Sequence, residues 1–138
     1  MSRQIRFHPP DCATEITVRA QQGRLLLRPS PKLKDIVLGV LGRAQRLFDM
    51  KIYLFVFMSN HFHLLLGPEN AHQTARFMNY VNSKLAREIG RLHGWTEHVW
   101  GRRYQAIPIS AEPAAILDRF RYVLSHGCKE GLVKDPRQ

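Results

Sequence analysis

Two histidines interrupt the apolar run Phe55-Val-Phe-Met-Ser-Asn-His-Phe-His-Leu-Leu-Leu-Gly67. Side chains alternate between the two faces of a strand, so His61 and His63 would leave the same face and could bind one metal ion. The apolar residues between and after them would point towards a core on the other face. Because imidazole is only a common ligand type, the pair alone also fits two structural histidines.

The dipeptide Ser59-Asn60 divides this run into two pieces of strand length. Residues 53–58 and 61–67 are predicted to form a β-hairpin with a tight turn between them. Residues 53–58 are apolar on both faces, so this strand is expected in the centre of a sheet, with helices covering at least one face.

The 138-residue chain has the length and composition of one folded domain. Its apolar fraction of 44% is sufficient for a proper core. No apolar run reaches the ~18 residues of a membrane span, and the N-terminus lacks the apolar stretch of a signal peptide. Cys12 and Cys128 are therefore expected to be reduced thiols in a cytoplasm. Residues 1–12 are predicted to be an N-terminal arm, and the native chain could continue past residue 138.

The charge of the chain favours a polyanionic partner. Twenty-one Lys and Arg against eleven Asp and Glu give a net charge of +10. Such an excess is typical of proteins that bind nucleic acid, although a solvated basic surface without a partner is the alternative. The sequence has no Gly-x-x-x-x-Gly-Lys-Ser/Thr motif, so nothing indicates the use of ATP.

The remaining sequence alternates between strand and helix patterns. Residues 15–20 and 24–28 are predicted to form a second hairpin, and residues 104–109 a strand at an edge, because Pro108 cannot donate a backbone hydrogen bond. Three helices are predicted, the first over residues 31–49 with Ser30 as its cap, the second after Asn70 and the third after residue 110. In the first helix, Gly39 and Gly42 indicate close packing against the sheet.

The helix after Asn70 has a basic face opposite its apolar stripe. This face carries Arg76, Tyr80, Lys84, Arg87 and Arg91. A one-sided basic stripe with an aromatic residue suits a phosphate backbone and a stacked base, although an ordinary solvated face has the same pattern. In the connection that follows, Arg102 and Arg103 are further DNA-binding candidates. Trp95 and Trp100 are expected to pack in the core or the loop, with a base-stacking platform as the alternative.

The last helix places a tyrosine away from its apolar stripe. The stripe is predicted to contain Ile116, Leu117, Phe120, Val123 and Leu124. At ~100° per residue, Tyr122 lies roughly opposite the centre of this stripe, and His126 follows one turn later. A tyrosine at the rim of the core is the alternative, but the stripe is complete without Tyr122.

These residues form a chemically coherent set. A divalent metal held by His61, His63 and His126 could neutralise charge on a phosphodiester as its transition state develops. Tyr122 could then attack phosphorus and expel a sugar hydroxyl. A phenol is protonated at neutral pH and is a weak nucleophile, so it would need a nearby cation or base. A covalent phosphotyrosine conserves the bond energy, so rejoining would need no ATP.

The order of these motifs resembles that of single-tyrosine transposases of the HUH endonuclease superfamily. Met58-Ser-Asn-His-Phe-His-Leu-Leu-Leu66 is similar to their His-hydrophobic-His signature. The likeness continues through the basic helix at residues 77–84, Trp100-Gly-Arg-Arg-Tyr104 and Arg119-Phe-Arg-Tyr-Val-Leu-Ser-His126, and covers most of the chain from about residue 14. It is greatest to REP-associated tyrosine transposases. Where the family often has Asn or Gln one turn after the tyrosine, this chain has His126.

The resemblance implies a ferredoxin-like, RRM-like α+β sandwich with a central antiparallel sheet. It also implies that Tyr122 is the nucleophile and that His61, His63 and His126 bind Mg²⁺ or Mn²⁺. The reaction would cleave and rejoin single-stranded or hairpin DNA through a 5′-phosphotyrosine, in the cytoplasm and at the nucleoid. Relatives are dimers or monomers, and the sequence leaves this choice open. A non-catalytic single-stranded nucleic-acid-binding module and a metal-dependent hydrolase that uses water are the competing functions.

Overall fold

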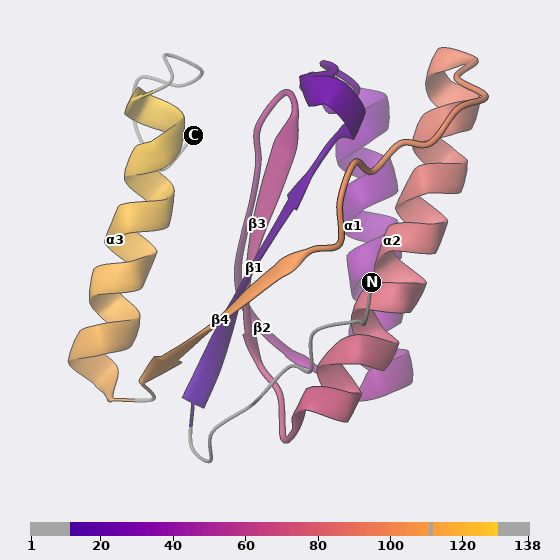
Figure 1. The fold of residues 1–138 in the computed structure, drawn as a ribbon. Helices are drawn as coiled ribbons and strands as arrows, with labels where there is room; N and C mark the ends of the chain where they lie inside the picture. Colours follow the sequence, from indigo (N-terminus) through magenta and orange to yellow (C-terminus); the bar gives the residue numbers. More distant parts are fainter. Residues whose placement is uncertain (1–11, 111, 130–138) are drawn as a thin grey trace.

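A computed structural model describes residues 12–110 and 112–129, with side chains as far as Ser125. The elements are β1 (Cys12–Arg19), η1 (Gln21–Gly23), α1 (Pro31–Phe48), β2 (Lys51–Phe57), β3 (His61–Gly67), α2 (Ala71–His93), β4 (Gln105–Ser110) and α3 (Pro113–Lys129). Figure 1 shows a central sheet with α1 and α2 on one face and α3 on the other. Of the residues predicted to form an N-terminal arm, Cys12 belongs to β1, and the others lie outside the described residues.

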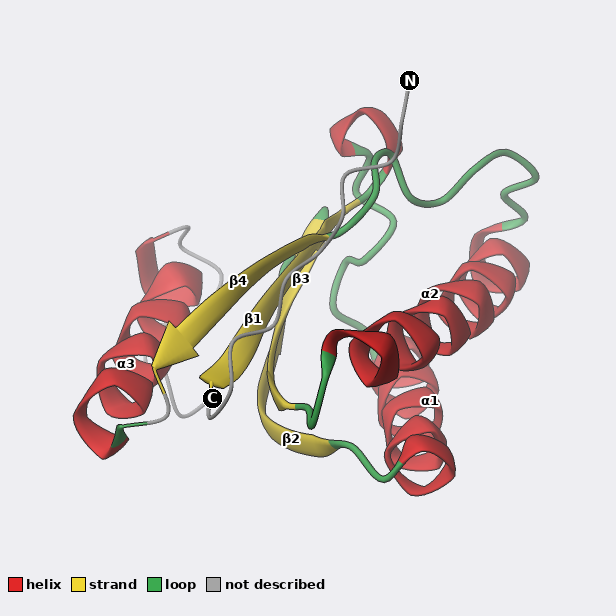
Figure 2. Ribbon diagram, turned by 60° about the horizontal axis from the view of Figure 1, so that its bottom comes forward, coloured by secondary structure: helices red, strands yellow, loops and turns green. Residues whose placement is uncertain are grey.

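The four strands form one antiparallel sheet in the order β2-β3-β1-β4. The sequence of elements through β4 is β-α-β-β-α-β, the ferredoxin-like arrangement, and α3 is added after it. Figure 2 shows the same layers from a second direction. The predicted ferredoxin-like α+β sandwich is therefore confirmed.

The main core lies between the sheet and the layer of α1 and α2. It draws on alternate residues of β1 and β3, namely Ile16, Val18, Phe62, Leu64 and Leu66. Leu41 of α1 and Phe77 of α2 belong to the same cluster. Because the period of a strand is two, the intervening residues of β1 and β3 point to the other face, over which α3 lies.

The histidine hairpin forms as predicted, but its first strand is at an edge of the sheet. The Met58 amide donates to the His61 carbonyl across the turn at 2.8 Å, and β3 is the one described strand that pairs with β2. The central placement of this strand was wrong because its apolar residues are not all covered. Phe57 stacks on Phe62 at 4.5 Å, whereas Tyr53 and Phe55 remain exposed.

The predicted hairpin between residues 15–20 and 24–28 does not form. Both edges of β1 are occupied, by β3 on one side and β4 on the other, so no edge remains for residues 24–28. A 3-10 turn follows β1 instead, and Leu26 and Leu27 are buried in the core from an irregular segment. The burial of Leu26 and Leu27 in the core, rather than strand formation, explains why residues 25–27 are apolar. The other edge strand, β4, contains Pro108 as predicted.

Both predicted helix caps are present. The Ser30 hydroxyl accepts from the Leu33 amide at 3.1 Å, and the Asn70 side chain accepts from the Gln73 amide at 2.8 Å. The explanation of Gly39 and Gly42 by close packing was wrong, because a Cβ atom at either position would have no neighbour within 4 Å. Within the described part of the chain, no helix combines the length and apolarity that crossing a bilayer requires.

Candidate active site on the histidine face

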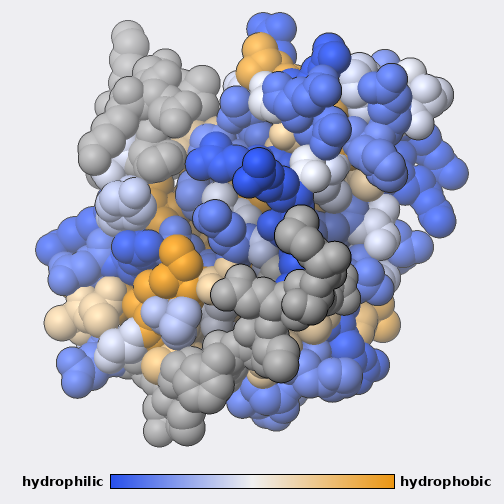
Figure 3. Space-filling model, in the orientation of Figure 1, coloured by the Kyte–Doolittle hydropathy of each residue, from blue (hydrophilic) through white to orange (hydrophobic). Residues whose placement is uncertain are grey.

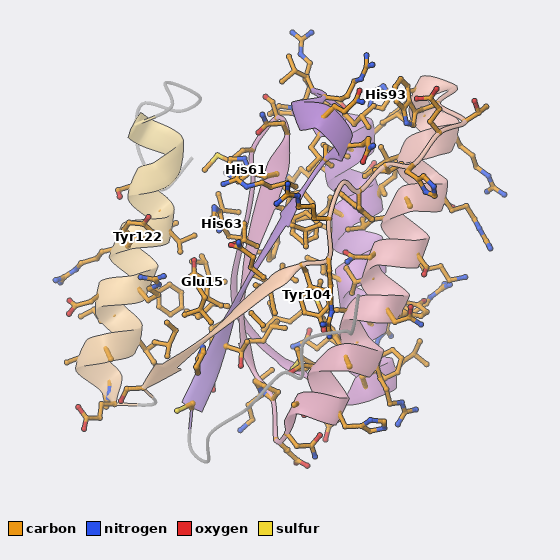
Figure 4. All side chains as sticks on the ribbon, viewed as in Figure 1. Glu15, His61, His63, His93, Tyr104 and Tyr122 are labelled. Carbon is orange, nitrogen blue, oxygen red and sulfur yellow. The ribbon has the colours of Figure 1, made fainter. Side chains whose placement is uncertain are left out.

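The pairing of β1 with β3 determines which side chains surround the two histidines. Arg19 lies opposite His61, Thr17 opposite His63, and Glu15 opposite Leu65. Directly opposed residues of an antiparallel pair share a face of the sheet. In Figure 4, Glu15, His61 and His63 point from the sheet towards the side on which α3 carries Tyr122. The two central strands therefore supply the histidine face, meaning here the sheet surface that faces α3.

His61 is buried, with an exposed fraction of 3%. Its Nδ1 atom lies 2.8 Å from Oδ1 of Asn60. An amide oxygen can only accept a hydrogen bond, so Nδ1 carries the proton in this arrangement. The neutral ring then has its lone pair on Nε2, an atom that is also buried.

His63 has a similar arrangement with different partners. Its Nδ1 atom lies 3.1 Å from the Thr17 hydroxyl and 3.7 Å from Oε1 of Glu15. A carboxylate beside Nδ1 favours the proton there and leaves the lone pair on the buried Nε2. The rings of His61 and His63 lie 5.1 Å apart between centroids.

These two histidines fit a divalent cation. Metal-binding histidines usually donate their other ring N–H to a carbonyl, a carboxylate or water, and the side-chain carbonyl of Asn60 gives His61 such a partner. For His63, the Thr17 hydroxyl is within hydrogen-bond distance of Nδ1, and the Glu15 carboxylate lies 3.7 Å away as a nearby negative charge. Among the side chains that the structure describes, no group of three His, Cys, Asp or Glu could hold a metal. The third predicted ligand, His126, belongs to α3, but its side chain lies outside the described part.

An ion pair connects α3 to this face. Nε of Arg119 donates to Oε2 of Glu15, and the Glu15 side chain is only 3% exposed. Sequence reasoning missed both residues. Glu15 is the one acidic residue of β1 and Arg119 lies three residues before Tyr122, and these two features are the sequence signals that could have identified them.

Tyr122 lies beside a cation on the helix that covers the histidine face. The Arg119 guanidinium carbon is 4.9 Å from the centre of the tyrosine ring. The tyrosine side chain is 45% exposed, whereas the next residue, Val123, is buried. One chain therefore brings the helix of Tyr122 to the same side of the sheet as both histidines, as a shared site requires (Figure 4).

The orientation of α3 differs from the predicted one. Leu117, predicted to be buried, is 49% exposed, while Arg119 turns towards the sheet and Glu15. At ~100° per residue, Arg119 lies about 40° from buried Val123, whereas Leu117 lies about 120° from it. Tyr122 consequently lies on the flank of the helix, between its packed and its solvent-facing sides. α3 continues past Gly127 to Lys129.

A cationic cleft adjoins the histidine face at the end of β1. It has a volume of about 490 Å³ and is lined by Thr17, Arg19, Ala20, Gln21, Gln22, Gly101, Arg102, Arg103 and Gln105. Thr17 belongs to both the cleft and the contacts of His63. Hydrophilic side chains gather in the upper half of Figure 3, and an apolar patch lies lower, between α3 and β4. Arg102 and Arg103 were predicted from sequence, whereas Arg19 became recognisable only from its register opposite His61.

The other predicted DNA-binding residues lie on α2, in the layer on the opposite face of the sheet. The Arg76 guanidinium is 5.5 Å from the ring of Phe48, and the half-buried ring of Tyr80 packs edge-on against Phe48 at 5.7 Å. Nζ of Lys84 lies 5.7 Å from the ring of Tyr80. Tyr80 is thus part of the contact between α1 and α2.

Arg87 and Arg91 line a second cleft, of about 550 Å³, at the end of α2. Trp95 and Trp100 also line it, and both pack against the core cluster, in agreement with their predicted packing role. The Trp95 indole donates to the His98 carbonyl, and the Trp100 indole donates to the Asn82 carbonyl. The predicted DNA-binding residues therefore fall into two groups, one beside the histidine face and one on the helical layer.

The family model described as "Transposase IS200 like" matches residues 17–124 of the chain. This match includes the histidine pair, the basic helix and Tyr122. The chain belongs to the IS200-like transposase family. No curated protein sequence matches the chain significantly.

Two solved structures of transposases are similar to this member of the family. One is a REP-associated tyrosine transposase bound to a REP hairpin, with a TM-score of 0.74 and 17% identity, covering 99% of this chain and 78% of that chain. The other is a protein from Deinococcus radiodurans described as a transposase, with a TM-score of 0.59 and 15% identity, covering 88% of this chain and 96% of that one. At these identities the two structures support the fold.

Proposed function

We propose that this IS200-like transposase family member cleaves and rejoins single-stranded DNA, presented beside a hairpin, with Tyr122 as its nucleophile. The observation that carries the proposal is the placement of α3. Among the helices that the structure describes, the one on the histidine face carries Tyr122, and Arg119 provides a cation beside its ring. The family membership and the hairpin bound by the similar REP-associated transposase support a DNA substrate.

The histidine pair prepares the site for a divalent cation, Mg²⁺ or Mn²⁺. Such a cation, held by Nε2 of His61 and His63 and by His126, would neutralise charge on the non-bridging oxygens of the scissile phosphate. The chain would contribute the orientation of these ligands: Asn60 and Thr17 lie within hydrogen-bond distance of the two Nδ1 atoms, and the charge of Glu15 favours a proton on Nδ1 of His63. Both imidazole rings are buried, so little solvent reaches these two ligands.

Tyr122 would attack the phosphorus atom through its phenolic oxygen. The new O–P bond forms as the bond between phosphorus and the 3′ oxygen of the preceding sugar breaks. The phenolic proton passes to solvent, and the departing oxygen takes up a proton to become a free 3′-OH. Arg119 would favour the developing phenolate by its charge. The reverse steps, with a second 3′-OH, rejoin DNA without ATP.

The other tyrosines are poorly placed for this reaction. The sequence contains four tyrosines. Tyr80 and Tyr104 pack against the core cluster on the opposite side of the sheet. The hydroxyl of Tyr53 lies beside Gly67, four residues along β3 from His63 and therefore about 13 Å away.

The cationic cleft offers a path for the strand that enters the site. Arg19, Arg102 and Arg103 could bind successive phosphates, while the three glutamines of the cleft could contact base edges. We further propose that Arg76, Lys84, Arg87 and Arg91 provide a second contact with a longer DNA, and that Tyr80 serves mainly in packing. Because α3 covers the histidines of its own chain, we propose that one chain is sufficient to form a site.

A non-catalytic RRM-like module is the alternative that the structure addresses most directly. Such modules stack bases on the open face of their sheet. In this chain both faces are covered by helices, and the histidine face lies under α3. This arrangement favours a catalytic use of that face over an open binding platform.

The test is to incubate labelled single-stranded DNA from beside the gene with the protein and Mn²⁺, and to resolve covalent adducts on a denaturing gel. Wild-type protein should form an adduct that EDTA abolishes and that Tyr122→Phe lacks. Tyr53→Phe and Tyr104→Phe are matched controls that should retain it. An adduct of normal yield in Tyr122→Phe would contradict the assignment, and cleavage without any adduct would indicate a hydrolase that uses water.

A further inference from the structure

Glu15 occupies an unusual position for a carboxylate. It lies in β1, a central strand, and its side chain is 3% exposed; no other Asp or Glu is buried among the residues that the structure describes. Taking a charged carboxylate out of water is costly unless it is paired and hydrogen-bonded. An apolar residue at this position of the histidine face would avoid that cost. A functional role would explain why a carboxylate is present there.

The two oxygens of Glu15 face two different elements. Oε2 accepts from Nε of Arg119 on α3, and Oε1 lies 3.7 Å from Nδ1 of His63 on β3. Through Arg119 the carboxylate also reaches Tyr122, because the guanidinium lies 4.9 Å from the tyrosine ring. A chain of contacts thus runs from His63 through Glu15 and Arg119 to Tyr122.

We infer that Glu15 is a positioning residue that prepares both the metal ligand His63 and the nucleophile Tyr122. This inference rests on the function proposed above and adds to it a group that touches neither metal nor DNA. Nδ1 of His63 lies 3.1 Å from the Thr17 hydroxyl and 3.7 Å from the carboxylate, whose negative charge favours the tautomer with the proton on Nδ1 and leaves the lone pair on Nε2. Carboxylates in this position typically strengthen metal binding by about 10–100-fold.

Towards Tyr122, Glu15 acts through Arg119. The arginine is three residues before the tyrosine, so both side chains lie on neighbouring parts of one helix surface. A guanidinium fixed by a buried carboxylate has one orientation, and the ring that it contacts is restricted in turn. Small misplacements of a reacting group can slow a reaction by about 100-fold, so this restraint should matter for the attack on phosphorus.

A purely structural ion pair is the competing explanation. It would stabilise the attachment of α3 to the sheet without affecting metal binding. The two explanations differ in what each partner of the pair controls. If Glu15 has both roles, its loss weakens metal binding and slows the reaction, whereas loss of Arg119 slows the reaction alone.

The experiment compares Glu15→Gln and Arg119→Met in the whole chain. Mn²⁺ affinity is measured by calorimetry, and the single-turnover rate of adduct formation is measured at saturating Mn²⁺. Glu15→Gln should weaken Mn²⁺ binding by about 10–100-fold, and both variants should slow adduct formation by about 100-fold. Asp118→Asn and Arg121→Met alter exposed charges beside Arg119 and should change neither quantity.

Unchanged Mn²⁺ affinity in folded Glu15→Gln would overturn the inference, as would equal losses of affinity in both variants. If Glu15→Gln does not fold, a measurement on the wild-type protein still tests the inference. Long-range ¹⁵N NMR of metal-free wild-type protein should show the His63 proton on Nδ1, and a proton on Nε2 would overturn the inference. Failure of wild-type protein to form any adduct would count against the proposed reaction, whereas the affinity and NMR results would still decide the role of Glu15 at His63.

Discussion

At His61 and His63, the chemistry depends on which ring nitrogen carries the proton. A metal needs the lone pair of Nε2, so each Nδ1 needs an acceptor. The strand period was enough to predict that both rings share one face. The Nδ1 partners of His63 were not predictable, because Thr17 and Glu15 are 46 and 48 positions away from it in sequence and meet it only through the register of β1 with β3.

Asn60→Ala tests the partner of His61. The substitution removes the acceptor 2.8 Å from Nδ1, so the ring can adopt the wrong tautomer. We expect about 10-fold weaker Mn²⁺ binding and a loss of about 1 kcal/mol in the free energy of unfolding. Calorimetry and urea titration measure the two effects. Ser59→Ala, in the same turn, is the control, and equal Mn²⁺ affinities of the two variants would contradict the role of Asn60.

At the scale of elements, α3 shows what helical periodicity alone leaves open. Its apolar residues predicted a buried stripe that includes Leu117, but a helix can rotate to satisfy a buried charge on its partner. Turning Arg119 towards Glu15 brings Leu117 out to 49% exposure. The caps at Ser30 and Asn70 were predictable because they depend on neighbours three residues away, whereas the rotation of α3 depends on a residue more than one hundred positions earlier.

Leu117→Gln and Val123→Ala together test this rotation. Leu117→Gln should change the free energy of unfolding by no more than about 0.5 kcal/mol, since about half of its surface is already exposed to solvent. Val123→Ala should lower it by about 1–3 kcal/mol, since that side chain is buried. Urea unfolding of both variants provides the measurement. A larger loss for Leu117→Gln than for Val123→Ala would indicate the orientation predicted from the apolar stripe.

Gly39→Ala tests the finding that α1 has space at this position. An added methyl group would meet no atom within 4 Å, and alanine favours the helical backbone. We expect the free energy of unfolding to rise by about 0.5–1 kcal/mol, with a corresponding increase in Tm. Gly94→Ala is the opposite control, because Gly94 ends α2 with a φ of 61° that alanine adopts with strain. A destabilised Gly39→Ala protein would contradict the open space.

At the scale of the whole molecule, positive charge occurs both on α2 and in the cleft beside the histidine face. Composition predicted a polyanionic partner, but it could not say which face the partner meets. The edge position of β2 was likewise not predictable from sequence. A strand with apolar residues on both faces has the same sequence pattern in the centre of a sheet and at an edge that helices partly cover. Only the strand order shows that β1 and β3, with Glu15, Thr17, His61 and His63, occupy the centre.

The salt dependence of DNA affinity can show which surface of the protein the DNA contacts. Replacing Arg19, Arg102 and Arg103 with Ala removes three cations from the cleft beside the histidine face. If each contacts a phosphate of a single strand, the slope of log K against log salt should decrease in magnitude by about 2. Fluorescence anisotropy with a short single strand gives this slope. A greater decrease for Arg76→Ala, Lys84→Ala and Arg87→Ala combined would place the short strand on α2 instead.

The division of the sheet into two faces has a consequence for how such a protein can evolve. None of Glu15, Thr17, His61 and His63 belongs to the main core cluster, which lies on the opposite face with α1 and α2. Mutations that abolish the chemistry can therefore leave the scaffold intact, and mutations that tune the scaffold can leave the chemistry untouched. A lineage could lose strand transfer in a few substitutions and keep a folded, strongly basic protein. Selection would then have a ready starting point for a DNA-binding protein that no longer cuts.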